Sequence, residues 1–190
     1  LSRPDLQDEL GSVRESDRFV AVLHELADRY GLALDEACLR AALRPGRVRA
    51  VILCPSNPFL SIAPILAVPG LRRSLRDNGA PVVAVSPIVG GRAIKGPTAK
   101  IMGELGLPAD VPAVAAHYRG LIDGLVIDRE DAGLQPRLQQ EGLQVAVTDT
   151  VMRSLDDRVR LAREVLDFAD AIGASPAPPL AVGSASVEPV

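Results

Sequence analysis

The short segment Pro55-Ser56-Asn57-Pro58 places a hydroxyl and an amide side chain between two prolines, directly after an apolar run. Such groups at the start of a helical segment can bind a phosphate, together with the free backbone N–H groups found there. The flanking prolines stiffen the turn and lower the entropy lost on binding. The same residue types also cap helices, so the segment predicts either a phosphate-binding turn or, more commonly, an ordinary N-cap.

A second segment, rich in glycine and proline, follows the next apolar run. It begins with Ser86-Pro87 and contains Gly90-Gly91, and paired glycines let a backbone approach a ligand closely. Lys95 offers a positive charge nearby. The segment does not match the P-loop pattern, because no Gly-Lys-Ser/Thr follows at the required spacing. The alternative interpretation is a flexible connection that binds nothing.

Two further strand ends carry polar residues, and a histidine ends one predicted helix. The triplet Thr148-Asp149-Thr150 could bind a hydroxyl or help to hold a metal, but such a triplet more often forms a turn before a capped helix. Asp128 and Asp131 belong to a charged cluster of the kind that usually lies on a solvated surface. His117 is a third-rank candidate, since a lone histidine is more often structural than catalytic.

The elements that must position these residues follow from hydrophobic patterning. Four apolar, β-branched runs predict strands over residues 48–54, 81–85, 124–128 and 143–149. Apolar spacing and capping signals predict helices over residues 16–30, 34–43, 71–79, 97–105, 111–119, 132–141 and 154–172. This alternation predicts an α/β fold: a doubly wound, mostly parallel, Rossmann-like sheet with helices on both faces. Because such sheets bind ligands beyond the carboxyl ends of their strands, the polar segments are expected to meet at one edge.

Three regions are expected along the chain. Residues 1–45 form a helical N-terminal segment, residues 46–172 an α/β nucleotide- or phosphate-binding domain, and residues 173–190 a Pro/Ala-rich tail of disordered type.

Composition excludes several classes of function. The 190 residues are 47% hydrophobic, so a globular core is expected, and the net charge of −3 argues against nonspecific nucleic-acid binding. Two cysteines do not make a disulfide framework, and Cys54 is expected to be a small buried hydrophobe. No apolar run is long enough to span a membrane and no signal peptide is visible, so a cytoplasmic protein is expected. The chain begins with Leu1, which leaves open that it is part of a longer protein.

Four blocks in order carry a resemblance to a known family: CPSNPFLSIAPILAVPGLR, PVVAVSPIVGGRAIKGPTAK, VAAHYRGLIDGLVIDRED and VAVTDTVM. Together they resemble the C-terminal half of the 2-phospho-L-lactate transferases, called phosphoenolpyruvate transferases in actinobacteria. This family acts in the biosynthesis of coenzyme F-420. The resemblance covers roughly residues 50–168.

The resemblance implies a reaction and its partners. A phospholactate or phosphoenolpyruvate activated by guanosine diphosphate would be the donor, and the ribityl hydroxyl of the deazaflavin Fo would be the acceptor. GMP would leave, with Mg²⁺ as the expected metal. Phosphoryl-type transfer is catalysed mainly by positioning and charge neutralisation, so no covalent nucleophile is required. The resemblance assigns both proline-containing segments to the ligand crevice, with Thr148 and Asp149 as second-rank candidates, and leaves the catalytic residue and the choice between lactate and enolpyruvate open.

The chain departs from the family at its start. The family opens with a strand leading into a Gly-Gly-Thr-Gly type loop, followed by aspartates expected to hold the metal, and residues 1–45 contain neither feature. Two alternatives therefore stay beside the transferase: a nucleotide-sugar-binding regulatory protein of the related gluconeogenesis-factor group, and an inactive fragment or subunit. A homodimer is compatible with the family.

Overall fold

Four parallel strands form the sheet of the computed structural model, which describes residues 48–174. Its strands are β1 (Val51–Leu53), β2 (Val82–Val85), β5 (Gly124–Asp128) and β6 (Gln144–Thr148). They lie in the order β1-β2-β5-β6, and every neighbouring pair is parallel. The predicted α/β class and parallel sheet are confirmed. Within the described residues the strands follow chain order, so the reversal of direction that defines a doubly wound sheet is not among them.

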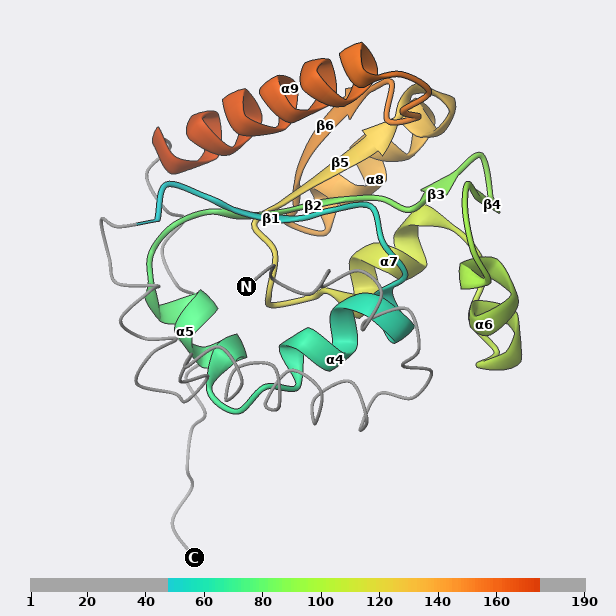
Figure 1. Cartoon of the computed structure of the whole chain (residues 1–190), viewed down its shortest axis with the longest axis horizontal. Coiled ribbons are helices and arrows are strands. Elements are labelled where there is room, and N and C mark those ends of the chain that lie inside the picture. Colours follow the sequence, from blue (N-terminus) through green and yellow to red (C-terminus); the bar gives the residue numbers. More distant parts are fainter. Residues whose placement is uncertain (1–47, 175–190) are drawn as a thin grey trace, which may run out of the picture.

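Helices cover both faces of this sheet. Between β1 and β2 lie a π-helical turn η1 (Pro58–Ile62), α4 (Ala63–Leu66) and α5 (Leu71–Asp77). Between β2 and β5 lie α6 (Thr98–Glu104) and α7 (Val111–His117). A 3₁₀ helix η2 (Arg129–Leu134) and α8 (Gln135–Gln140) precede β6, and α9 (Leu155–Ala174) ends the described chain. Figure 1 shows α9 on one side of the sheet and α4, α5 and α7 on the other.

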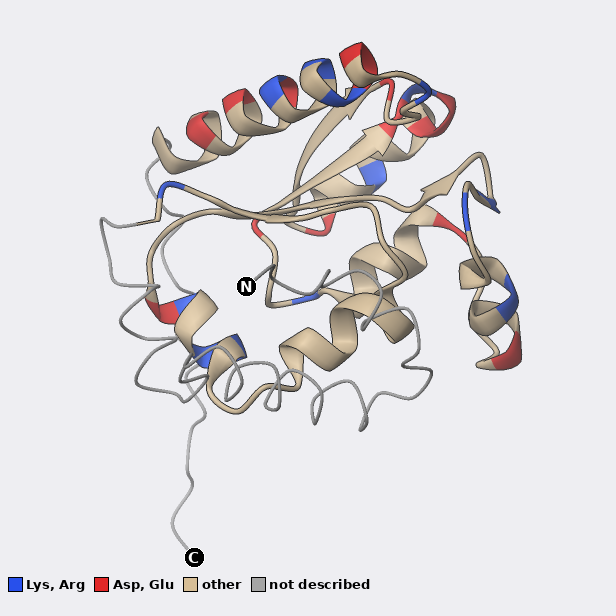
Figure 2. Cartoon of the chain, viewed as in Figure 1, with Lys and Arg blue, Asp and Glu red and all other residues tan. Residues whose placement is uncertain are grey.

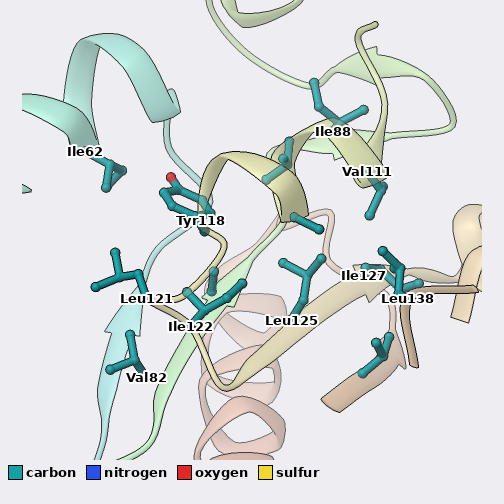
Figure 3. Close-up of a cluster of buried hydrophobic side chains, with 14 of the residues drawn as sticks. Ile62, Val82, Ile88, Val111, Tyr118, Leu121, Ile122, Leu125, Ile127 and Leu138 are labelled. Carbon is teal, nitrogen blue, oxygen red and sulfur yellow. The ribbon is translucent and has the colours of Figure 1, made fainter. Parts of the chain in front are cut away.

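Alternation of side chains along the strands produces two cores. Val82, Ala84, Leu125 and Ile127 point toward α4, α5, α7 and α8 and join the larger core, part of which Figure 3 shows. The intervening residues of the same strands point toward α9 and pack on its buried side chains: Val83, Val85 and Val126 meet Leu161, Val165 and Ala169. Because both faces of the sheet are buried, successive residues of β2 and β5 are nearly all apolar rather than alternately apolar and polar.

One expectation about local structure was wrong. The segment over residues 86–97, predicted to be a loop, contains a small antiparallel hairpin formed by β3 (Ile88–Val89) and β4 (Arg92–Ala93). The helix predicted over 132–141 is confirmed as α8, although its first residues belong to the 3₁₀ helix η2. The predicted capping box before α9 is confirmed, because Ser154 Oγ accepts from Asp157 N at 3.1 Å and Asp157 Oδ2 accepts from Ser154 N at 2.8 Å.

Several predictions fall outside the described residues. They concern the helices over 16–30 and 34–43, the boundary near residue 45 and the tail over 173–190, of which only the first two residues are described. Among the helices in residues 48–174, none combines the length and apolarity that crossing a membrane requires.

Candidate functional site

The polar segments gather at the carboxyl edge of the sheet. Parallel pairing aligns Leu53 of β1 with Ala84 of β2, and Asp128 of β5 with Thr148 of β6. Each polar segment follows one of these strand ends directly. The structure therefore brings the segments singled out in the sequence to one edge, as their positions after parallel strands require.

Asn57 acts as a helix cap in the first segment. Its Oδ1 accepts from the backbone N–H groups of Phe59 and Leu60 at 2.9 and 3.0 Å, and its carbonyl accepts from Ser61 and Ile62. The N–H groups at the start of η1 are therefore already bonded, and the expectation that they are free for a phosphate was wrong. The capping role does not use Asn57 Nδ2, which is buried and has no hydrogen-bond partner among the described residues.

The remaining members of this turn shape its backbone. Pro58 is buried at the first position of η1, whereas Pro55 and Ser56 are half-buried. Ser56 N donates to the carbonyl of Cys54 at 2.7 Å, which tightens the turn. Cys54 itself is exposed, so the expectation of a buried thiol was wrong: β1 ends at Leu53, before this side chain could enter a core.

His117 lies against this turn although it comes from α7. Its ring centroid is 4.7 Å from that of Phe59, and it also contacts the ring of Tyr118. Burial lowers the pKa of His117, and the positive charge of Arg72 lowers it further. Its Nε2 is buried without a hydrogen-bond partner among residues 48–174. Asn57 and His117 thus each bring to the surroundings of Phe59 a polar nitrogen that has no partner among the described residues.

Ser86 is enclosed in the turn after β2. It is 2% exposed, and its Oγ donates to the carbonyl of Ile88 at 2.9 Å and accepts from Ile88 N at 3.2 Å. Its hydroxyl therefore fixes the path of the chain into the hairpin. Pro87 beside it is half-buried, and Lys95 at the far end of the hairpin is exposed.

The Gly90-Gly91 turn faces carboxylates. Both glycines have left-handed φ values, +55° and +72°, as the hairpin turn requires. Gly90 N donates to Asp131 Oδ2 at 3.0 Å, and a Cβ on Gly90 would lie 2.3 Å from Glu130 Oε2. Arg92 forms an exposed ion pair with Glu130 at 3.3 Å. The negative charges at this turn oppose the binding of a phosphate there.

Asp128 and Asp131 are buried, so their assignment to a solvated surface was wrong. Asp128 accepts from Glu130 N at 3.0 Å, and from Thr150 N and Oγ1 at 2.8 and 3.0 Å. Burial alone would raise the pKa of Asp128, but these hydrogen bonds together lower it. Burial raises the pKa of Asp131, which is 9% exposed and lies near three other carboxylates. Thr150 belongs to the Thr148-Asp149-Thr150 segment singled out from the sequence, but only the fold brings it to Asp128.

Thr148 and Asp149 form a turn that α9 holds in place. Thr148 is buried, and its hydroxyl contacts the carboxylate of Glu164. Arg160 Nη2 donates to the carbonyl of Asp149 at 2.7 Å, and Asp149 Oδ1 accepts from Val151 N at 3.2 Å. The turn that the sequence favoured for this segment is confirmed. Arg160 and Glu164 were missed, since nothing in the sequence of α9 shows which turn it faces.

The described residues do not form a metal centre by themselves. No group of three or more His, Cys, Asp and Glu side chains in residues 48–174 is arranged to hold an ion. The carboxylates closest to the site, Asp128 and Asp131, already accept hydrogen bonds from the backbone. The donor set therefore does not fit Mg²⁺ without ligands from elsewhere.

A hollow of about 610 Å³ lies at the opposite, amino edge of the sheet. Its walls include Gly79, Gly120 and Gly142, where helices turn back into strands, and Gly173 next to the end of the described chain. Arg76, Asp123 and Gln144 are the polar side chains among its lining residues, but parallel sheets bind ligands at the carboxyl edge. We therefore assign the candidate site to the carboxyl edge rather than to this hollow.

A parallel sheet with helices on both faces and polar turns at its carboxyl edge defines a Rossmann-like α/β domain. The model of the family described as 2-phospho-L-lactate transferase CofD matches residues 36–165, and the chain belongs to this family. The resemblance carried by the four sequence blocks is thereby confirmed.

Curated relatives carry transferase names. The chain is 38% identical to the phosphoenolpyruvate transferase of Streptomyces coelicolor over 128 residues, which cover 67% of this chain and 40% of the relative. It is 42% identical to the 2-phospho-L-lactate transferase of Methanocaldococcus jannaschii over 118 residues, or 62% of this chain and 36% of the relative. The chain thus spans well under half the length of the relatives it matches.

Proposed function

We propose that this chain takes part in the transfer of a phospholactyl or phosphoenolpyruvyl group in coenzyme F-420 biosynthesis. The donor is the guanosine-diphosphate-activated acid, the acceptor is the terminal ribityl hydroxyl of Fo, and GMP is released. The observation that carries the proposal is the meeting of the Asn57 turn and the Gly90 hairpin at the carboxyl edge of a chain that belongs to this family. The cytoplasm as the site of the reaction and a homodimeric state stay predictions.

The Asn57 turn suits the phosphates of the donor. Asn57 Nδ2 is a buried donor without a partner among the described residues, and a phosphate oxygen would satisfy it. Ser56 adds a hydroxyl, and the positive charge of Arg72 is close enough to act on the neighbouring His117. Pro55 and Pro58 hold the turn before the ligand arrives, which reduces the entropy lost on binding.

The Gly90-Gly91 hairpin suits the neutral, hydroxyl-rich acceptor better than a phosphate. Glu130 and Asp131 beside it would repel an anion and accept hydrogen bonds from hydroxyls. The attacking hydroxyl must lose its proton as its oxygen bonds to phosphorus and the bond to GMP breaks. Asp131, whose pKa burial raises, is the candidate acceptor for that proton.

Mg²⁺ stays part of the proposal as the expected metal, with ligands that lie outside the described residues or on the donor. When bound it would neutralise phosphate charge. This proposal gives a structural role at the carboxyl edge to Thr148, Asp149 and Ser86. Their polar side-chain groups form hydrogen bonds within the protein.

The direct test mixes the full chain with Fo, Mg²⁺ and each activated donor and follows GMP release. Turnover with one donor only would decide between lactate and enolpyruvate. Because the chain spans 40% of the Streptomyces coelicolor relative, binding is tested separately by calorimetry with GDP. If the chain shows no turnover and does not bind GDP, the inactive fragment or subunit replaces the transferase as the proposed function.

Variants of Asn57 separate capping from binding. Asn57→Ala removes both the cap and the amide, whereas Asn57→Ser keeps a capping oxygen and removes only the amide. A hydrogen bond to a charged oxygen contributes about 1.5–3 kcal/mol, so we expect both variants to weaken GDP binding by roughly ten- to a hundredfold. Lys95→Ala, on an exposed side chain, is the control and is expected to change affinity little. Unchanged affinity in folded Asn57→Ser would remove this amide from the site.

A further inference from the structure

Two nitrogen atoms without hydrogen-bond partners flank the side chain of Phe59. Within residues 48–174, Asn57 Nδ2 and His117 Nε2 are both buried and unbonded. Asn57 Oδ1 accepts from Phe59 N at 2.9 Å, and the ring centroid of His117 lies 4.7 Å from that of Phe59. A buried polar atom without a partner costs stability, so two of them beside one aromatic ring indicate a group that bonds to both when it is present.

The charge that acts on this place is positive. Among the described residues, Arg72 lowers the pKa of His117 and opposes the rise that burial causes in the pKa of Tyr118, and no carboxylate offsets it. Arg72 is exposed, and no ion pair within residues 48–174 uses it, whereas its neighbour Arg73 pairs with Asp77. In Figure 2, α4 and α7 carry neither basic nor acidic residues, whereas α5 carries basic ones.

These groups form a donor set for a small anion. A neutral imidazole can carry its proton on Nε2 and donate it, the amide of Asn57 donates through Nδ2, and a guanidinium donates to carboxylates or phosphates. Asn57, Phe59 and His117 are each half-buried. Rotation of side chains, which is common when ligands bind, would therefore open both nitrogens to a small group.

We propose that His117 Nε2 and Arg72 bind the carboxylate of the lactyl or enolpyruvyl group that the donor carries. The inference rests on the proposed function, in which the donor's phosphates lie at Asn57. In the donor the carboxylate carbon is three bonds, or roughly 4 Å, from phosphorus. The side chain of Phe59 bridges a comparable space between Asn57 and His117, and its ring offers an apolar surface to the methyl or methylene group of the acid.

This assignment gives the chain a means to select its donor. A nucleotide sugar has no carboxylate at this position, so it would leave the His117 nitrogen buried and unbonded. Sites that are built to hydrogen-bond one substrate group reject analogues that lack it, because the protein's own polar atom is then left without a partner. His117 and Arg72 thereby separate an activated acid from the nucleotide sugars that a regulatory relative would bind.

Calorimetry with two esters of GDP tests the inference on the full chain, with Mg²⁺ present and Fo left out so that no transfer occurs. The lactyl ester carries the carboxylate, and the ethyl ester differs from it only by lacking that group. We expect the wild type to bind the lactyl ester roughly ten- to a hundredfold more tightly than the ethyl ester. His117→Phe keeps a ring beside Phe59 but removes the N–H group, and it should lose most of this preference. His117→Gln places an amide N–H near the position of Nε2 and should retain part of it.

Two adjacent arginines provide a matched control. Arg72→Met and Arg73→Met remove the same charge from neighbouring positions of α5, and only the first should reduce the preference for the lactyl ester. Equal affinity of the wild type for both esters would overturn the proposal and assign the two nitrogens to ordered water. An equal loss of both esters in folded His117→Phe, or the same preference in both arginine variants, would overturn it as well. In each case GDP binding would still support the proposed function, whereas absence of binding by GDP and by both esters would overturn both.

Nuclear magnetic resonance gives a second readout that a merely structural histidine would not move. The chain contains two histidines, so in a His24→Gln variant every imidazole signal belongs to His117. The lactyl ester should fix the proton on Nε2 and shift the resonance of that nitrogen, and the ethyl ester should not. Identical imidazole spectra with the two esters would show that His117 does not contact the carboxylate.

Discussion

Removing the carboxylate of Asp128 should loosen the carboxyl edge where β5 and β6 end. Asp128 is 5% exposed and accepts three hydrogen bonds, from Glu130 N and from Thr150 N and Oγ1. Asp128→Asn keeps one accepting oxygen but turns an NH₂ group toward a donor, and Asp128→Ala leaves the buried Thr150 N unbonded. With about 1.5–3 kcal/mol for each hydrogen bond to a charged group, we expect a loss of about 2 kcal/mol for Asn, which disrupts one bond, and of about 5 kcal/mol for Ala, which removes all three.

Urea unfolding followed by circular dichroism measures this effect. With a slope of about 2 kcal/mol/M, the expected losses move the midpoint down by about 1 M for Asn and about 2.5 M for Ala. Thr150→Val, which removes only the hydroxyl, should cost about 1.5 kcal/mol. Asp167→Asn, on an exposed residue of α9, is the matched control. A midpoint for Asp128→Asn equal to that of the control would refute the assignment of Asp128 as the link between the two strand ends.

The hydrogen bonds of the Asp128 carboxylate also determine how the stability of the protein should depend on pH. Hydrogen bonds to the carboxylate hold the pKa of Asp128 below its usual value in the folded state, against the opposing effect of burial. The stabilisation is therefore fully present above about pH 4, the pKa region of an unfolded aspartate, and is lost as the pH falls through the lower folded value. The difference in stability between the wild type and Asp128→Asn should shrink in acid. A difference that grows below pH 4 would contradict this sign.

Three glycines give further predictions. A Cβ on Gly124 would lie 2.8 Å from the ring of Phe168 on α9, so Gly124→Ala should lower the free energy of unfolding by about 1–3 kcal/mol. An unchanged melting temperature would show that α9 packs less closely on β5. Gly90→Ala should lower the free energy of unfolding by about 1–2 kcal/mol, because alanine is strained at a left-handed φ, and the contact of its Cβ with Glu130 should lower it further. Gly91→Ala has the same backbone strain but no neighbour within 4 Å, so in thermal melts it should be the milder change; the reverse order would exclude a role for Glu130.

Local patterns predicted the framework well. The four strands were recognisable because β-branched, apolar runs suit a sheet buried on both faces, and the capping box of Ser154 and Asp157 located the start of α9. The β3–β4 hairpin was missed, because two-residue strands are too short to show a period of two. The sequence also suggested both roles of Asn57, but only coordinates separate its bonded oxygen from its unbonded nitrogen.

The charged residues were the least predictable part of the site. Asp128 and Asp131 stand in a run of charges that favours solvent exposure, and their burial depends on partners far away in the chain. Gly90 lies 41 residues before Asp131, and Thr150 lies 22 residues after Asp128. Because local sequence carries no information on such partners, a buried carboxylate and a solvated one look alike until the fold brings the strand ends together.

The carboxyl edge is electrically uneven, and this unevenness bears on how two substrates would be oriented. Beside β1, the lowered pKa of His117 reflects burial and the positive charge of Arg72, and Asn57 Nδ2, which has no partner among the described residues, lies on the same side. Beside β5, the raised pKa of Asp131 reflects burial and its carboxylate neighbours. A diphosphate ester is therefore favoured near β1 and disfavoured near β5, whereas a polyol has no such preference for the β1 side.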